Sequence, residues 1–353
     1  MDTPFQFSRY VTGKYFVGRR NDCQALADLL SEGRSVAMWG PPKSGRMSLL
    51  QQTLLNMRSA GKKVVPCIVD MTSASDADDF VRRFVKSVKA AGMQNSMSVD
   101  IGPDTPLGAA DIETAAMLPF GQAEKLDGSL VVVIREFQNI GTGKGEMFMK
   151  ALERAMATFG EDRRCQFVFM GSRANAMSEI FQRRKFFWGS VEHFRLSPIS
   201  DAEISDHVLR GFSAGGKVID RGLLEDVCRM FRNNIWHINH FFFICDSLSK
   251  GYISEITVKD ALECLTAVHE PKFKAVMDDL TGFQKSMLRA VLDGHMKLSA
   301  TDVIEKYGLN SSANVKRLRD ALMKKEVVMF NDKDEPELED PLFGHWLKNS
   351  YFR

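Results

Sequence analysis

The sequence predicts a parallel α/β domain, followed by a helical segment and a final three-helix unit with a β-hairpin. Three observations support this order. An apolar run at 35–39 leads into a glycine loop and then into a helical pattern at 47–60, which is the strand–loop–helix context of a phosphate-binding turn. Apolar strands alternate with helical segments as far as Pro198, as in a parallel sheet. After Pro198 the strands stop, and only a short terminal hairpin is expected beyond it.

Each element of the α/β part has its own pattern. The strongest strand is Ser129–Ile134, which is apolar and β-branched on both faces, as buried parallel strands are. The expected strands are 35–39, 63–70, 129–134, 166–170 and 193–196, and the expected helices are 47–60, 78–91 and 147–158, with a helix or turn at 178–187. Residues 92–118 have little periodicity, so we expect a surface excursion or a hairpin insertion there.

The C-terminal part is expected to hold two further domains. Helices are expected at 201–212, 221–231, 235–249 and 257–268, and then, after a break at Pro271, at 282–292, 300–307 and 313–325, with a hairpin of strands at 327–331 and 337–339. Three helices and a β-wing are typical of a winged helix. We therefore expect domains at 1–198, 199–270 and 271–353.

Composition excludes several classes of protein. The 353 residues are 44% hydrophobic and 26% charged with a net charge of +2, as in a globular protein that has no global attraction for an acidic partner. Six cysteines lie scattered without a CxxC pair, which disfavours zinc and disulfides and fits a reducing cytosol. The chain opens without a signal-peptide pattern, and the longest apolar run, near 241–245, is too short for a bilayer. We expect a cytoplasmic protein with no membrane partner.

The glycine loop carries two substitutions. A phosphate-binding loop G-x-x-x-x-G-K-[ST] uses Lys to reach the β- and γ-phosphates and Ser or Thr to hold Mg²⁺. Here Arg46 stands at the Lys position and Met47 at the Ser/Thr position. The residues that would surround the phosphates are Gly40, Pro41, Pro42, Lys43, Ser44, Gly45, Arg46, Met47 and Ser48.

The end of the strongest strand carries a third substitution. In a P-loop ATPase this strand ends in Asp-Glu, where Asp orients Mg²⁺ and its water and Glu polarises the attacking water. This chain has Arg135 and Glu136 at the two positions. Taken alone, the pair also fits a buried strand that ends in two surface charges, but the glycine loop upstream favours the ATPase interpretation.

Six segments, in order along the chain, extend this interpretation to a family resemblance. They are Tyr15–Arg19, Arg135–Asn139, Phe169–Ser172, Asn233–His237, Leu309–Val315, and Asp340–Phe343 with Trp346. Together they resemble the archaeal-type, AAA-like P-loop ATPases, which are related to the STAND group and end in a winged helix. The resemblance implies a parallel sheet of order 5-1-4-3-2, a helical lid and a winged helix. It also implies that Phe16 and Val17 lie beside the base, with Glu136 and Ser172 facing the γ-phosphate as catalytic groups.

The substitutions bear on the chemistry. Methionine does not ligate a hard cation, and Ser48 does not replace the lost hydroxyl, because one helical step turns a side chain by ~100°. At an effective dielectric of ~20, a unit charge on Arg135 at about 4 Å from a cation costs about 4 kcal/mol per unit charge. We therefore expect no metal site and no Mg²⁺.

Two interpretations of the pocket remain open. In the first, Arg46 and Arg135 neutralise the phosphates of ATP or ADP directly, so that nucleotide binds without turnover. In the second, the pocket is empty and Arg135 pairs with Glu136 or another acid. The first predicts a hydrolysis-deficient, nucleotide-responsive regulatory or interaction protein. The alternatives are an active ATPase of the same family and a nucleotide-free winged-helix scaffold or DNA-binding protein.

The expected partners follow from two basic segments. The helix at 314–325 carries Lys316, Arg317, Arg319, Lys324 and Lys325 and is a candidate for duplex DNA. The alternative is contact with an unknown protein, which the acidic wing favours because it repels phosphates. The run Arg183–Trp188 is expected to pack its aromatic residues inward and expose its charges, and the alternatives are nucleic-acid binding or an arginine donated to a second copy in a homo-oligomer.

Overall fold

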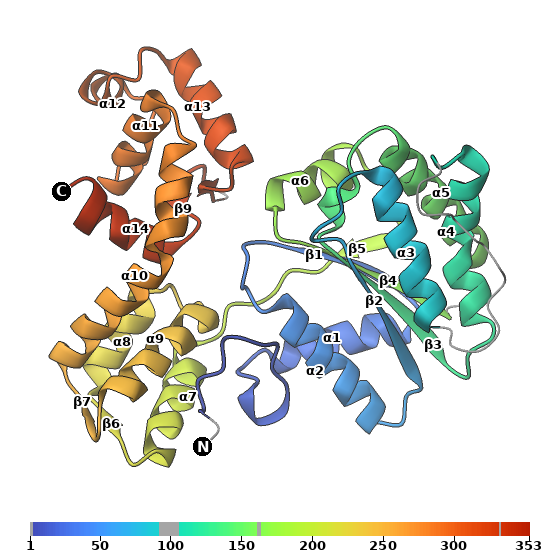
Figure 1. Ribbon diagram of the computed structural model, residues 1–353, viewed down its shortest axis with the longest axis horizontal. Coiled ribbons are helices and arrows are strands. Elements are labelled where there is room, and N and C mark those ends of the chain that lie inside the picture. The colour runs from blue at the N-terminus through green and yellow to red at the C-terminus, as the bar shows by residue number, and fades with distance from the viewer. Residues whose placement is uncertain (1–2, 92–105, 161–163, 332) are drawn as a thin grey trace. The chain divides into compact units, whose positions relative to one another are not determined.

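The computed structural model describes residues 3–91, 106–160, 164–331 and 333–353 (Figure 1). The chain forms two compact units. One is Tyr10–Ser197, and the other combines the residues up to Arg9 with Pro198–Arg353.

The first unit is built on a parallel sheet with the strand order β2-β3-β4-β1-β5 (Figure 1). Its strands are β1 (Ser35–Trp39), β2 (Val64–Asp70), β3 (Ser129–Arg135), β4 (Cys165–Gly171) and β5 (Val191–His193). Read from the opposite edge, this is the predicted order 5-1-4-3-2, which is confirmed. The last strand begins two residues and ends three residues earlier than predicted.

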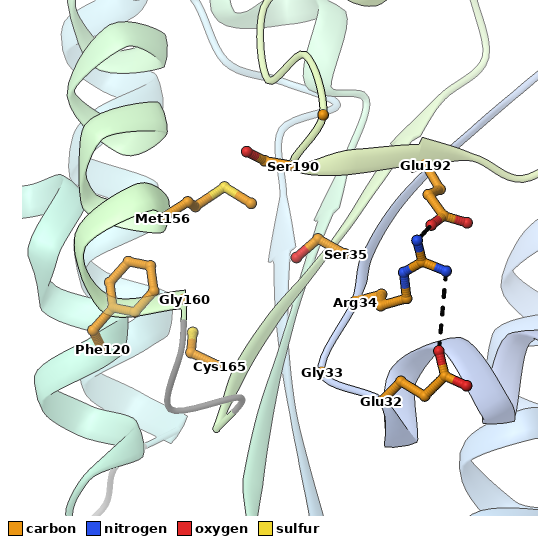
Figure 2. Close-up of a pocket in the computed structure, with 11 residues that line it drawn as sticks. Glu32, Gly33, Arg34, Ser35, Phe120, Met156, Gly160, Cys165, Ser190 and Glu192 are labelled. Atoms are coloured by element: carbon orange, nitrogen blue, oxygen red, sulfur yellow. Dashed lines mark ion pairs between the residues drawn. The ribbon is translucent and has the colours of Figure 1, made fainter.

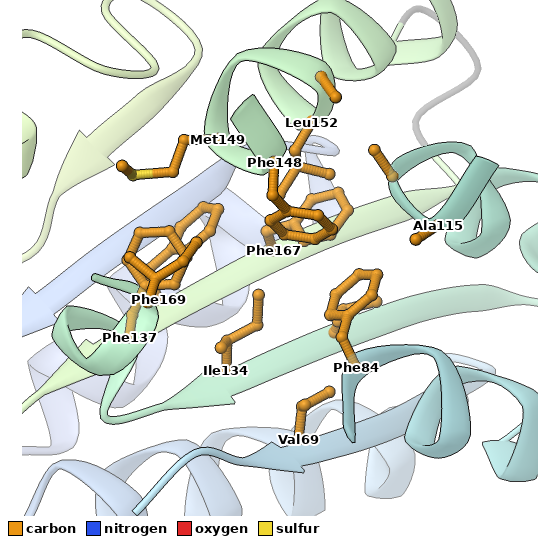
Figure 3. Close-up of a cluster of buried hydrophobic side chains, with 14 of the residues drawn as sticks. Val69, Phe84, Ala115, Ile134, Phe137, Phe148, Met149, Leu152, Phe167 and Phe169 are labelled. Atoms are coloured by element: carbon orange, nitrogen blue, oxygen red, sulfur yellow. The ribbon is translucent and has the colours of Figure 1, made fainter. Parts of the chain in front are cut away.

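Alternate residues of each central strand face opposite sides of the sheet, and each side has its own core. Val131 and Val133 pack with helices α1 (Arg20–Ser31) and α2 (Arg46–Ser59). Val132 and Ile134 pack on the other side, with helices α3 (Ala77–Ala91), α4 (Ala109–Ala123) and α5 (Lys144–Phe159). Figure 3 shows Phe84, Phe148, Phe167 and other members of this second core above the strands. Burial on both faces explains the uninterrupted apolar sequence of β3.

The prediction of an irregular segment at 92–118 is wrong for its second half. Residues 92–105 lie outside the described part of the chain, but α4 begins at Ala109 and is helical through Pro119 to Ala123. Its buried face uses small residues, Ala115 and Ala116, beside Phe120. A stripe of alanines gives little contrast between faces, so the helical period was missed.

The second unit is largely helical, as predicted. It contains α7 (Asp201–Ala214), α8 (Arg221–Met230), α9 (Ile235–Leu248) and α10 (Glu255–Asp278). Two unpredicted two-residue strands, Val218–Ile219 (β6) and Tyr252–Ile253 (β7), pair in parallel. The break expected at Pro271 is also absent, since α10 runs through it to Asp278. Burial of Phe273 and Met277 beyond the proline offsets the one helical hydrogen bond that proline cannot donate.

The remaining elements form the predicted three helices and hairpin. They are α11 (Gly282–Leu292), α12 (Thr301–Tyr307), α13 (Ser312–Lys324), β8 (Val328–Phe330) and β9 (Pro336–Leu338), followed by α14 (Pro341–Trp346). The two strands pair antiparallel, with Met329 opposite Glu337. Within the described residues, no helix is long and apolar enough to cross a membrane.

The N-terminal segment belongs to this helical unit. Phe5 is fully buried and packs against the rings of His207, Phe212 and Phe242. Trp236 Nε1 donates to the Phe7 carbonyl over 2.8 Å. These contacts explain why the residues before Arg9 fold with a part of the chain that begins nearly 200 residues later.

Candidate functional site

The glycine loop joins β1 to α2 at the carboxyl edge of the sheet. Its backbone is left-handed at Lys43 (φ 65°) and Gly45 (φ 92°), and Gly40 has a φ of 150°. The first turn of α2 has no side-chain cap. Its leading N–H groups therefore point toward the loop without a side-chain acceptor from the N-cap, which is the arrangement that binds phosphate at helix N-termini.

Arg46 folds back across this loop. Its side chain is 9% exposed, and Nη1 donates to the carbonyl oxygens of Gly40 (2.6 Å) and Pro41 (3.0 Å) and to Ser44 Oγ (2.8 Å). Arg46, which the sequence analysis assigned to the phosphates, is thus hydrogen-bonded to the loop itself.

The side chains of Met47 and Ser48 both contact other parts of the first compact unit. Met47 is 8% exposed and belongs to the core cluster with Val36 and Met38. Ser48 Oγ accepts a hydrogen bond from the backbone N–H of Val11 over 3.2 Å. Among the described residues, no group of three or more His, Cys, Asp or Glu side chains could hold a metal ion.

Arg135 pairs with an acid on the neighbouring strand. Its Nη1 lies 2.6 Å from Asp70 Oδ2, and the two residues are register partners at the ends of β3 and β2. Partial burial raises the pKa of Asp70, but hydrogen bonds from Thr72 and the charge of Arg135 outweigh it and hold that pKa below its ordinary value. This is the pairing that the second interpretation of the pocket predicted, with Asp70 as the acid.

Glu136 and Ser172, which the resemblance assigns to the γ-phosphate, are hydrogen-bonded to each other. Glu136 Oε2 accepts from Ser172 Oγ (2.5 Å), from the Ser172 N–H (3.2 Å) and from Gln138 Nε2 (2.6 Å). Because Gly171 is the register partner of Trp39, the strand ends place this cluster beside the glycine loop. Glu136 itself has a left-handed backbone, with a φ of 55°.

These contacts do not test the prediction that Phe16 and Val17 lie beside a nucleotide base. Phe16 is partly buried and packs against the core cluster that holds α1 and α2. Val17 follows it and is also partly buried. Their place beside a nucleotide base stays a prediction.

The sequence-based prediction missed Arg19, which contacts the loop, and Asp22, which shares the partner Ser197 with it. Arg19 Nη1 donates to the Ser44 carbonyl (2.7 Å), and its Nε donates to the Ser197 carbonyl (2.8 Å). Burial lowers the pKa of Arg19, but arginine stays protonated at neutral pH. The buried Asp22 accepts from the N–H and the hydroxyl of Ser197, over 2.8 and 2.7 Å. Arg19 closes the Tyr15–Arg19 segment, whereas no motif singles out Asp22.

A separate cavity lies at the opposite, amino edge of the sheet. It has a volume of about 280 Å³ and is lined by Ser35, Cys165 and Ser190, at the starts of three strands, together with Phe120 and Met156 (Figure 2). Arg34, at its rim, forms ion pairs with Glu192 and Glu32. The cavity lies at the edge of the sheet opposite the glycine loop, and none of the loop residues lines it.

The positive charges of the basic helix α13, in the winged helix, are partly neutralised. Arg319 forms a two-point ion pair with Asp334 and stacks over the Phe330 ring at 3.8 Å. Lys325 pairs with Asp279. Lys316, Arg317 and Lys324 are exposed and form no ion pair with other described residues. The acidic wing residue Asp332 lies outside the described part of the chain.

The second basic segment, Arg183–Trp188, differs from the prediction at its last residue. Phe186 and Phe187 are buried, as expected, but Trp188 is 70% exposed. Arg184 pairs with Glu146 over 2.9 Å, and Arg183 lies 3.5 Å from Glu179.

Comparison with known proteins supports the fold. A family model described as a probable winged helix domain matches residues 271–349. No curated protein matches the chain. The solved structure of a Walker-type ATPase of Pyrococcus abyssi aligns with a TM-score of 0.72 at 12% identity, covering 98% of this chain and 99% of that one. The ADP form of the Aeropyrum pernix ORC2 protein gives 0.57 at 14% identity, covering 96% and 93%. The ORC1 protein of the same organism, solved in complex with DNA, gives 0.52 at 14% identity, covering 96% and 94%. The chain therefore has the fold of P-loop ATPases of the ORC type, with a C-terminal winged helix.

The Arg135–Asp70 pair generates a prediction about stability. At pH 7, Asp70→Asn should lower the free energy of unfolding by up to about 1 kcal/mol, because the pair is partly exposed. The folded-state pKa of Asp70 is lowered, so the difference should persist above pH ~3.9, the unfolded value, and vanish as the pH falls through the folded value. Urea unfolding at several pH values measures this.

The matched control is Asp127→Asn, because Asp127 pairs with Lys63 but is 86% exposed. It should leave stability unchanged across the same range. An equal loss in both variants would contradict a specific role for Asp70.

Proposed function

We propose that this chain is a nucleotide-responsive regulatory or interaction protein, which binds ATP or ADP in its glycine loop without Mg²⁺ and without hydrolysis. The observation that carries the proposal is Met47: the residue at the metal-ligating position lies in the hydrophobic core and offers no oxygen. Backbone groups of Gly40–Ser48 with Arg46 would hold the phosphates, Phe16 and Val17 would lie near the base, and Glu136 and Ser172 would face the γ-phosphate.

Nucleotide binding is favoured by the loop. The left-handed residues Lys43 and Gly45 and the uncapped start of α2 form an anion-binding turn. Arg46 adds a positive charge whose planar fork matches phosphate oxygens. If it turned toward a phosphate, Arg46 would exchange three neutral acceptors for charged ones, which form the stronger hydrogen bonds.

Absence of hydrolysis is favoured by the strand ends. A cation, Arg135, stands where the orienting carboxylate of the metal belongs, and it is bonded to Asp70. Glu136 already accepts hydrogen bonds from Ser172 and Gln138, so a water molecule would compete with both for this general base. The competing proposals are an active ATPase of this family and a nucleotide-free scaffold.

Calorimetry with ATP tests the proposal. The wild-type chain should bind ATP with equal affinity in EDTA and in Mg²⁺, because no side chain of the loop would use the metal. Arg46→Ala should weaken binding at least about tenfold, the scale of one lost charged hydrogen bond.

The control is Arg58→Ala, since Arg58 lies on the same helix but donates to the Val64 carbonyl at its far end. It should bind as the wild type does. No heat in either buffer would overturn the proposal in favour of a scaffold. Gly45→Val is a poor probe, because Gly45 has a φ of 92° and an added Cβ would lie 3.0 Å from Arg19 Nη1.

For the winged helix we propose contact with a protein partner. Arg319 and Lys325 are held by acids of the same unit, which removes two of the five cations expected to meet phosphates. DNA binding is the second candidate, favoured by the exposed Lys316, Arg317 and Lys324. A cytoplasmic location and a homo-oligomer stay predictions.

A gel shift on random duplex DNA separates the two candidates. Protein contact predicts retardation only at low salt, because phosphate-driven binding falls steeply with salt concentration. A shift that persists at about 150 mM salt and is lost in the double variant Lys316→Ala, Arg317→Ala would establish DNA binding instead.

A further inference from the structure

The chain passes between its two compact units twice, after Arg9 and after Ser197. On the α/β side, the residues at both passages are hydrogen-bonded to the glycine loop or to the start of α2, directly or through one side chain. We infer that the glycine loop is coupled to the two passages, residues 10–13 and 195–197. A change of loop conformation should weaken or strengthen the hydrogen bonds at both passages together. This inference goes beyond nucleotide binding and does not depend on it.

The second passage is tied to the loop through Arg19. The guanidinium donates from Nε to the Ser197 carbonyl (2.8 Å) and from Nη1 to the Ser44 carbonyl in the loop (2.7 Å). Asp22 fixes the same serine by accepting from its N–H and its hydroxyl. The last residue before the passage is therefore held on both sides of its backbone, and one of its two anchors also holds the loop.

The first passage is tied to α2. The N–H of Val11 donates to Ser48 Oγ (3.2 Å), and that of Gly13 donates to Gln52 Oε1 (2.6 Å). Ser48 and Gln52 lie one helical turn apart on α2. On the other side of Arg9, the Gln6 carbonyl accepts from Asn239 Nδ2 (2.9 Å), and Phe5 is fully buried in the helical unit. Both ends of this passage are therefore anchored.

Arg46 connects these anchors. Its Nη1 donates to Ser44 Oγ (2.8 Å), and the carbonyl of this same Ser44 accepts from Arg19. Arg46 is also the first residue of α2, two positions before Ser48. If Arg46 leaves the loop, Ser44 and the start of α2 lose a common support, and the hydrogen bonds that hold both passages are weakened with them.

Hydrogen exchange on the full chain without ligand tests the inference. Arg46→Ala should speed exchange in peptides covering 10–13 and 195–197 by about fivefold, the factor that corresponds to about 1 kcal/mol. Arg58→Ala, at the other end of α2, should leave both peptides at wild-type rates. Unchanged exchange within β3 shows that the variants remain folded.

Two further variants test the connection to each passage separately. Ser48→Ala should speed exchange at 10–13 alone, and Asp22→Asn at 195–197 alone. Wild-type rates at both passages in Arg46→Ala would overturn the inference. So would acceleration by Arg58→Ala equal to that by Arg46→Ala.

A final arm adds ATP in EDTA to the wild-type chain and follows binding by calorimetry. If ATP binds, both passages should change their exchange rates together, and binding without such a change would contradict the inference. If it does not bind, the proposed function fails, and the ligand-free variants still decide the inference.

Discussion

The site depends on one interaction, the hydrogen bonds from Arg46 Nη1 to the oxygens of Gly40, Pro41 and Ser44. A guanidinium is a rigid planar donor that stays charged, so it braces a tight turn more firmly than an ammonium on a flexible stem does. Because it bonds to both ends of the loop, it supports the left-handed turn and the start of α2 at once. Ser44, which it holds, is also the residue that Arg19 contacts.

The three substituted positions form a consistent set. Arg46 is bonded within the loop, Met47 is part of the core, and Arg135 is paired with Asp70 on the next strand. Glu136 has partners in Ser172 and Gln138. Each of these charges is thus paired or hydrogen-bonded to protein groups, and a metal here would have to displace them while facing the charge of Arg135. The chain has the P-loop ATPase fold, and we propose that its metal chemistry has been lost.

The sequence was sufficient for the α/β sheet, whereas the site residues stay a prediction. Apolar strands that alternate with helices predicted a parallel sheet, and its strand order was what the family resemblance implied. The helix α4 was not predicted, because alanines on its buried face give little contrast in hydropathy. The break predicted at Pro271 was wrong, because α10 continues through the proline. The partner of Arg135 was left open because Asp70 is 65 residues away, and only the strand register brings them together. The hydrogen bond from the Val11 N–H to Ser48 Oγ could not be predicted either, because no local pattern encodes it.

The central claim is that this P-loop fold does not use a metal to cleave ATP. Phosphate release from ATP by the purified full chain, in Mg²⁺ and again in EDTA, tests it most directly. The structure predicts release at the background rate in both buffers, for the wild type and for Glu136→Gln alike. Release that requires Mg²⁺ and disappears in Glu136→Gln would show a working active site and would contradict this account.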